Sequence, residues 1–422
     1  MDPDLKETVS ESRRAPDSAW TKLPSPGTNP GRGLQPLQRR LLGAGLLSLL
    51  AWLLLQWLAP PTVLPWTPAM RTAAETMARA LEATAAYCRS HGIPVDPVQD
   101  PAGTCLVGPQ LTPLFTTLGQ PEAKRTTLNP DVAALLVHLL RKAGVGFGDT
   151  VAVGSSASFP GLLVATMSAT EALGAVPVPI LSLGASSFGA TRPEFHLLDL
   201  YLLLNREGII RTPPAAVSLG GEGDVGLGFP RELRDSLSAE IIRSGVPFLR
   251  EDSFPLNVAR RMEIYCGGSS RVGSGDASSS PANGSGSTGE GTCPVAAFVN
   301  AGGAQANLGT SPAVLGVPAG LNTYLPPNLE LPPEPQRGVL FQMAARGVPI
   351  IHLLHIRGLA LKHGLPWDPR TIPPMGSTPL RSGEPSRGFA FWLLTGVYLF
   401  SVGWILFRRS SRGDGAAAPS SP

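Results

Sequence analysis

Small polar residues gather in four loops, each of which follows a predicted strand: residues 154–160, 182–189, 219–226 and 300–305. In open α/β sheets, ligands bind beyond the carboxyl ends of the strands. Backbone N–H groups at helix N-termini and Ser hydroxyls there favour an anion, such as a carboxylate, phosphate or sulfate. The alternative is that these loops are only tight turns. The residues expected to bind the anion are Ser155, Ser156, Ser158, Ser186, Ser187, Gly220, Gly221, Asp224, Asn300, Gly302 and Gly303.

Two serines in the first loop, Ser156 and Ser158, are candidates for a nucleophile. Ser156 lies between a strand and a helix, as in a nucleophile elbow, but that pattern requires Gly where Ser158 stands. His196 and His355 are the candidate bases, although nothing in the sequence ties either to these serines. A third histidine, His352, is flanked by apolar residues and is expected in the core. The sequence therefore favours a non-catalytic role and leaves catalysis open.

Cofactor, metal and nucleic-acid sites have little support. The chain contains no phosphate-binding Gly-x-x-x-x-Gly-Lys-Ser/Thr motif. Glu222 and Asp224 could bind a cation, but two carboxylates in a loop are usually solvated. The chain has no Cys-x-x-Cys, its net charge is only +3, and its Lys and Arg are scattered. We expect no cofactor, no metal and no nucleic acid.

The elements that must position these loops alternate between strand and helix. This alternation predicts a mostly parallel, Rossmann-like α/β sheet flanked by helices, within a domain of residues 67–365. The predicted strands are residues 150–154, 176–182, 215–219, 246–249, 295–300 and 348–354. The predicted helices are residues 69–90, 132–142, 160–173, 195–205, 230–243, 256–265, 338–346 and 356–363.

Two apolar runs, residues 41–59 and 388–407, predict one transmembrane helix near each chain end, because each approaches the ~20 residues needed to cross a bilayer. Lys and Arg near their ends set the orientation. The tail side has Lys22, Arg32, Arg39, Arg40, Arg408, Arg409 and Arg412, and the domain side has Arg71, Arg370, Arg381 and Arg387. We therefore expect a two-pass cell-membrane protein with both termini cytoplasmic and the main domain extracytoplasmic.

All four cysteines lie between these runs. Cys88 and Cys105 bracket a Pro-rich loop, and Cys266 and Cys293 bracket a Gly/Ser tract. Two local disulfides would suit an oxidising compartment. Four cysteines allow three connectivities, and four unpaired thiols are a further alternative.

Pro, Gly and Ser also mark the segments expected to be tails and linkers. Gly and Pro number 48 and 44, and charged residues make up only 15% of the chain. Residues 1–40 are expected to be a disordered cytoplasmic tail and residues 408–422 a second cytoplasmic tail, with a Gly/Ser insertion at 267–291. Pro-rich linkers are expected at 326–335 and 366–387.

Several blocks, in order between about residues 129 and 309, resemble the poly-γ-glutamate system protein family, an accessory membrane component of bacterial poly-γ-glutamate synthesis. The blocks are Gly-Asp-Thr-Val-Ala-Val-Gly (148–154), Ser-Phe-Pro (158–160), Gly-Ala-Ser-Ser-Phe-Gly-Ala (184–190), Ser-Leu-Gly-Gly (218–221) with Asp224, and Val-Asn-Ala-Gly-Gly (299–303). They cover less than half of the chain. The Gly/Ser insertion and the long polar tails depart from the family pattern.

The resemblance implies an accessory role in synthesis or export of this capsule or secreted polymer, beside a membrane-bound ATP-dependent ligase. It supplies no catalytic residues. We expect the loops to bind poly-γ-glutamate or another carboxylate ligand. Two alternatives stay open: an extracytoplasmic amide hydrolase or transferase acting on the polymer, and a purely structural anchor of the synthase complex.

Overall fold

The computed structural model describes residues 36–58, 61–267, 293–385 and 389–407, and the chain divides into two units. One unit contains the helices near the chain ends, and the other is the folded domain Pro61–Pro385. The tails, expected at 1–40 and 408–422, and the Gly/Ser insertion, expected at 267–291, fall largely outside the described residues.

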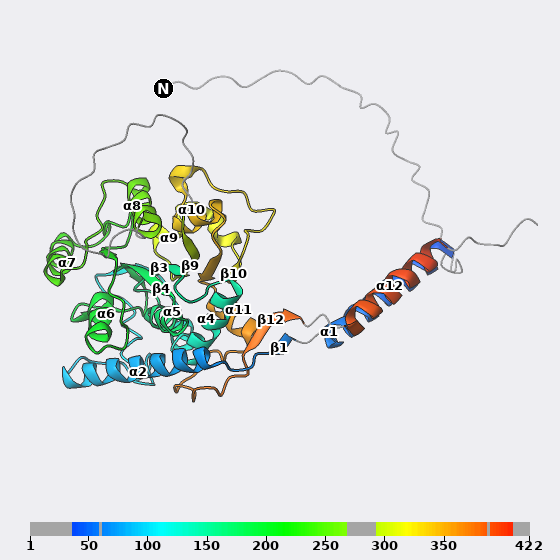
Figure 1. The fold of residues 1–422 in the computed structure, drawn as a ribbon, viewed down its shortest axis with the longest axis horizontal. Helices are drawn as coiled ribbons and strands as arrows, with labels where there is room; N and C mark the ends of the chain where they lie inside the picture. Colours follow the sequence, from blue (N-terminus) through cyan, green and yellow to red (C-terminus); the bar gives the residue numbers. More distant parts are fainter. Residues whose placement is uncertain (1–35, 59–60, 268–292, 386–388, 408–422) are drawn as a thin grey trace, which may run out of the picture. The chain divides into compact units, whose positions relative to one another are not determined.

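A six-stranded sheet forms the centre of the domain, with strand order β10-β11-β9-β3-β4-β8 (Figure 1). Only β10 at the edge is antiparallel to its neighbour, so the expected mostly parallel α/β sheet is confirmed. The strands are β3 (Thr150–Ser156), β4 (Val176–Ser182), β8 (Ala216–Ser218), β9 (Val295–Ala301), β10 (Gly320–Asn322) and β11 (Ile350–Leu353).

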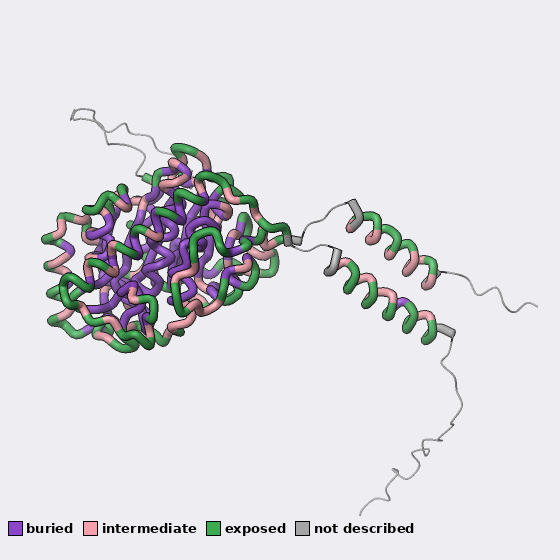
Figure 2. The backbone as a smooth tube through the Cα atoms, turned by 90° about the horizontal axis from the view of Figure 1, so that it is seen from below, coloured by how far each residue is buried: buried purple, intermediate pink, exposed green. Residues whose placement is uncertain are grey.

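Alternating residues of these strands enter two hydrophobic clusters, one on each face of the sheet. Val153 and Val299 pack into the first cluster, and Ala152 and Phe298 into the second. On the first face lie α4 (Asp131–Lys142), α5 (Pro160–Ala172), α6 (Leu197–Arg206) and α11 (Ile356–His363), and α2 (Pro68–Ser90) packs against α4 and α5. The second is covered by α8 (Phe254–Gly267) and α10 (Val339–Ala345). Figure 2 shows buried residues concentrated between these layers.

The remaining elements of the domain are short except for α7, and most of them have no clear sequence pattern. They are β1 (Pro61–Val63), β2 (Phe115–Thr117), α3 (Pro121–Thr126), β5 (Ala185–Ser186), β6 (Thr191–Arg192), β7 (Phe195–His196), α7 (Arg231–Ser244), α9 (Gln305–Leu308) and β12 (Arg381–Pro385), with 3-10 turns at Pro312–Gly316 and Glu334–Gln336. Of these, α7 matches the helix expected at residues 230–243.

Two expected elements differ from the structure. The strand expected at residues 246–249 is reduced to a single bridge between Val217 and Phe248. Pro247 within this segment has no N–H with which to continue a ladder. The helix expected from residue 195 begins at Leu197, because Phe195 and His196 pair with β6 instead.

The segment expected as a linker at 366–387 packs onto the domain over much of its length. Its β12 pairs antiparallel with β1. The backbone N–H groups of Gly376 and Thr378 donate to the buried carboxylate of Asp131, at 2.8 and 2.9 Å. The other expected linker, 326–335, runs into the 3-10 turn Glu334–Gln336.

Both expected disulfides are present. Cys88 bonds to Cys105, joining the end of α2 to the loop before β2. Cys266 bonds to Cys293, joining the end of α8 to the start of β9 across the Gly/Ser tract. The described residues contain no free cysteine.

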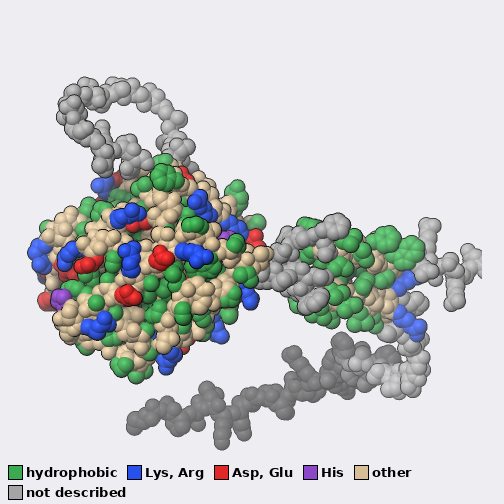
Figure 3. Space-filling view, turned by 60° about the horizontal axis from the view of Figure 1, so that its bottom comes forward, with side chains coloured by type: hydrophobic (Ala, Val, Ile, Leu, Met, Phe, Trp, Pro, Cys, Tyr) green, Lys and Arg blue, Asp and Glu red, His purple; other side chains and the backbone are tan. Residues whose placement is uncertain are grey.

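The terminal unit consists of α1 (Pro36–Leu58) and α12 (Phe389–Phe407), which pack against each other. The hydroxyl groups of Ser48 and Tyr398 are 2.8 Å apart. Hydrophobic side chains cover much of the described surface of these helices (Figure 3). Among the described helices, only α1 is long and apolar enough to cross a membrane, through Gln38–Leu55. The apolar stretch of α12, Phe391–Ile405, is shorter. Length and composition therefore support a membrane span for one of the two expected helices, α1.

Candidate functional site

The four predicted loops meet at the carboxyl edge of the sheet, where two cavities lie side by side. The first, called here the basic cavity, has a volume of about 500 Å³. The second, the glycine cavity, has a volume of about 310 Å³, and both are lined by Thr117, Ser158 and Gly303. The remaining lining of the basic cavity is Leu118, Gly119, Gln120, Ala123, Lys124, Phe159, Ser186, Leu354, His355, Ile356, Arg357, Gly358 and Trp367.

A buried lysine, Lys124, is the most unusual group of the basic cavity. Its side chain is 2% exposed. Its Nζ donates to the Ser158 carbonyl oxygen, lies 2.7 Å from Ser186 Oγ and sits 3.7 Å from the centre of the Phe159 ring. Within the described part of the chain Lys124 forms no ion pair. Because burial penalises the ammonium form, the pKa of Lys124 is lowered to about 7.

The position of Lys124 follows from the short parallel pairing of β2 with β5. This pairing places the segment after β2 directly against the loop after β4. Helix α3 then starts at Pro121, where a fixed φ suits the first helical turn. Lys124 lies one turn further on, so its side chain reaches the serines of the neighbouring loops.

Two more basic side chains line this cavity. His355 and Arg357, at the start of α11, are both exposed. The Arg357 guanidinium lies 5.8 Å from the centre of the Trp367 ring. Among the residues that the structure describes, none that lines the basic cavity is Asp or Glu. The ionisable groups that these residues contribute to the cavity are basic, which favours an anionic ligand.

Two of the predicted serines stand together in this cavity. The backbone N–H of Ser186 donates to Ser158 Oγ at 3.0 Å, and Ser186 Oγ contacts Lys124. Ser187, the neighbour of Ser186, lines neither cavity, and its buried hydroxyl has no hydrogen-bond partner among the described residues. Of the described serines predicted to bind the ligand in the first two loops, Ser158 and Ser186 are the two that line a cavity.

The remaining residues of the first and fourth loops support the backbone behind the cavities. Ser155 Oγ donates to the Ala301 carbonyl oxygen at 3.3 Å, and Ser156 Oγ accepts from the Gly303 N–H at 3.2 Å. Ser156 is 1% exposed, so the resemblance to a nucleophile elbow finds no geometric support. Nδ2 of Asn300 donates to the Gly302 carbonyl oxygen and lies 3.1 Å from His352 Nδ1. Burial lowers the pKa of His352 to about 4, as suits a core histidine.

The third loop forms one wall of the glycine cavity through Gly220, Gly221 and Glu222. Gly220 has a φ of +73°, and a Cβ there would lie 2.5 Å from the Gly184 nitrogen, so only glycine fits. Asp224, expected to bind the ligand, is buried instead. Its Oδ2 lies 2.6 Å from the Arg261 guanidinium, and its Oδ1 accepts from Ser182 Oγ at 3.0 Å. Asp224 thus anchors the loop.

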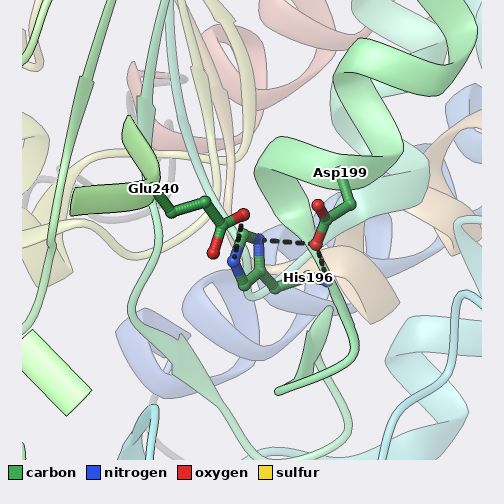
Figure 4. Close-up of side chains that lie close together, drawn as sticks. All are labelled: His196, Asp199 and Glu240. Carbon is green, nitrogen blue, oxygen red and sulfur yellow. Dashed lines mark hydrogen bonds and ion pairs between the residues drawn. The ribbon is translucent and has the colours of Figure 1, made fainter. Parts of the chain in front are cut away.

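The candidate base His196 lines neither cavity and is held between two carboxylates (Figure 4). Its Nδ1 lies 3.1 Å from Asp199, and its Nε2 lies 3.1 Å from Glu240. Burial alone would lower the pKa of His196, but the hydrogen bond to Glu240 and the charges of Asp199 and Glu240 outweigh it and raise the pKa.

These three residues are close enough together to hold a metal ion, with ligand atoms within 4.8 Å of one another. The two carboxylates, however, face opposite ring nitrogens of His196, and a single ion binds only one of them. The arrangement is better suited to an imidazolium that joins α6 to α7.

Comparisons with protein-family models, with curated proteins and with solved structures gave no match to this chain.

Lys124 and Arg357 are functional candidates that the sequence pattern did not indicate. Lys124 lies in a stretch that had no predicted element, and lysine is ordinarily a surface residue. Arg357 follows a predicted strand end, the same position that identified the Gly/Ser loops, so this position could have singled it out.

Proposed function

We propose that this protein binds a carboxylate-bearing polymer at the basic cavity, as a membrane-anchored accessory component of poly-γ-glutamate synthesis or export. The observation that carries the proposal is the lining of that cavity, to which the described residues contribute Lys124, His355 and Arg357 but no acidic side chain. Ser158 and Ser186 add hydroxyl donors. The block-by-block resemblance to the poly-γ-glutamate system proteins supplies the identity of the polymer.

Arg357 is the group best suited to hold a carboxylate. Its guanidinium is exposed at the cavity, and a guanidinium binds a carboxylate through two parallel hydrogen bonds. Poly-γ-glutamate has one carboxylate per residue. Arg357 can therefore bind the carboxylate of one residue while the main chain of the adjacent residue enters the cavity. Lys124 lies deeper in the cavity, because it is buried whereas Arg357 is exposed.

We propose that α1 and α12, which precede and follow the domain in the sequence, cross the membrane as two antiparallel helices. Their mutual packing and their exposed apolar side chains support this role. Two spans place both termini on one side, and the Lys/Arg distribution favours the cytoplasm for that side. The two disulfides agree with an oxidising location for the domain.

A binding measurement on the full-length protein in detergent tests the proposal. Fluorescent poly-γ-glutamate oligomers should bind, and the affinity should fall about 10- to 100-fold in Arg357→Ala, because a charge-assisted hydrogen bond contributes about 1.5–3 kcal/mol. The matched control is Arg231→Ala, which removes an exposed arginine of α7 that lines neither cavity. Equal binding of a polymer whose carboxylates have been amidated would contradict the proposal. Absent binding would favour a structural anchor.

A further inference from the structure

We infer that Ser186 and Lys124 form a nucleophile–base pair that cleaves amide bonds of the bound polymer or transfers the acyl group. The identity of the substrate rests on the proposed function, whereas the chemistry does not. The reaction class is acyl transfer through a serine ester. The pair differs from the candidates suggested by sequence alone, because the base is a lysine and the nucleophile lies in the second loop.

The geometry of the pair meets the first requirement of such chemistry, which is contact between nucleophile and base. Nζ of Lys124 and Oγ of Ser186 are 2.7 Å apart, within the range for proton transfer. A neutral amine has two N–H donors and one lone pair. One N–H can donate to the Ser158 carbonyl oxygen, which leaves the lone pair to accept the Ser186 hydroxyl proton.

The surroundings of the amine meet the second requirement, a base that is unprotonated near neutral pH. Lys124 is buried, and none of the described residues that line its cavity is acidic. Burial lowers its pKa to about 7, although the face of the Phe159 ring favours the ammonium form. A buried lysine without a carboxylate partner destabilises the folded protein. Its position beside a serine in a cavity indicates a functional role.

Access and orientation meet the third requirement. Ser186 and Lys124 both line the basic cavity, into which the substrate enters. The Ser186 N–H donates to Ser158 Oγ, which orients the backbone of the nucleophile. Helix α5 begins at Pro160, next to the lining residues Ser158 and Phe159, and the partial positive charge at its N-terminus favours the negative charge of a tetrahedral intermediate nearby.

The reaction balances without a cofactor. Ser186 Oγ attacks the amide carbonyl carbon, and its proton passes to the neutral Lys124 amine. The tetrahedral intermediate collapses, the C–N bond breaks, and the Lys124 ammonium gives the proton to the departing nitrogen. Water then attacks the ester carbonyl, and Lys124 carries a proton from the water to Ser186 Oγ. Each cleaved amide consumes one water, and an amine acceptor in place of water gives transfer.

The other serines near the sheet edge are excluded by their contacts. Ser156 Oγ accepts from the Gly303 N–H behind the cavity, and within the described residues the buried hydroxyl of Ser187 has no hydrogen-bond partner that could take its proton. Ser158 lines the cavity, but its Oγ accepts from the Ser186 N–H, and Lys124 contacts its carbonyl oxygen rather than its hydroxyl. Ser158 is therefore a positioning residue in this scheme.

The test uses a fluorophosphonate probe, which reacts with activated serines whether or not the substrate is known. The full-length protein in detergent is incubated with the probe, and the adduct is located by peptide mass spectrometry. We expect an adduct on Ser186 that is absent in Ser186→Ala and unchanged in rate in Ser187→Ala. In Lys124→Met the labelling rate should fall at least about 100-fold, the usual contribution of a general base.

A pH profile keeps the inference testable if Lys124→Met does not fold. In the wild-type protein the labelling rate should rise with pH through a midpoint near 7, as the lysine loses its proton. Absence of an adduct on Ser186 between pH 6 and 9, or labelling of Lys124→Met at the wild-type rate, would overturn the inference. Polymer binding without an adduct would refute the pair alone, and an adduct without polymer binding would refute the proposed function alone.

Discussion

Replacing Asp224 by Asn tests whether a buried ion pair anchors the third loop. Asp224 and Arg261 are fully buried, and Arg261 also donates to Ser182 Oγ and Ser218 Oγ, at 3.0 and 2.8 Å. Asp224 has a φ of +64°, a conformation that Asn tolerates better than most residues. Asp224→Asn therefore removes the charge and leaves the shape and the backbone conformation nearly unchanged.

The expected loss of stability is about 3 kcal/mol. Removing one partner of a buried pair usually costs about 3–5 kcal/mol, and the Asn side-chain oxygen still accepts a hydrogen bond from Arg261, which places the value at the lower end. This loss raises the unfolding equilibrium constant about 150-fold. In urea unfolding of the full-length protein, followed by near-ultraviolet circular dichroism, the midpoint should fall by about 1 M for a slope of about 3 kcal/mol/M.

The control for this measurement is Asp235→Asn, because Asp235 pairs with Arg231 on the exposed surface of α7. Exposed pairs contribute little, so no resolvable change is expected. A second variant, Arg261→Met combined with Asp224→Asn, should lose less stability than the sum of the single changes, because the two residues interact. A loss below about 1 kcal/mol for Asp224→Asn would refute the anchoring role.

Three further outcomes follow from the same structure. Because the pKa of His196 is raised in the folded protein, the stability that its charged form contributes is complete below the unfolded pKa of about 6.5 and is lost as pH rises through the folded pKa. His196→Gln should therefore flatten the pH dependence of the urea midpoint between pH 6 and 9. Replacing Cys88 and Cys105 by Ser should lower the unfolding free energy by about 3 kcal/mol, as expected for a closed loop of this length, and native protein should resist a maleimide gel-shift reagent until it is reduced. Gly303→Ala should fold normally, since the nearest atom to its new Cβ is 3.9 Å away, but should weaken ligand binding. Gly220→Ala should instead lower the unfolding midpoint, and equal stability of the two variants would contradict the packing described.

The central fold was predictable because its signals are local. The strand expected at 176–182 matches β4, and the apolar run from Pro160 matches α5. The disulfides were also predictable as a hypothesis, since each joins cysteines that bracket one loop. By contrast, β10 and the β1–β12 pair are very short, and their pairing depends on tertiary contacts that no local pattern encodes.

The candidate site was only partly predictable. The position of the ligand loops follows from a general rule of parallel sheets, so the convergence of Ser158, Ser186 and Gly303 could be expected. Which loop residues face the cavity could not be expected. The role of Asp224 depends on Arg261, 37 residues away, and the burial of Lys124 depends on the pairing of β2 with β5.

The most direct test of the central claim is an experimental structure of the full-length protein with a γ-linked glutamate trimer. We predict that the trimer occupies the basic cavity, with a carboxylate in hydrogen-bond contact with the Arg357 guanidinium and an amide carbonyl beside Ser186. A trimer bound elsewhere on the domain, or an empty basic cavity at saturating trimer, would contradict the proposed function.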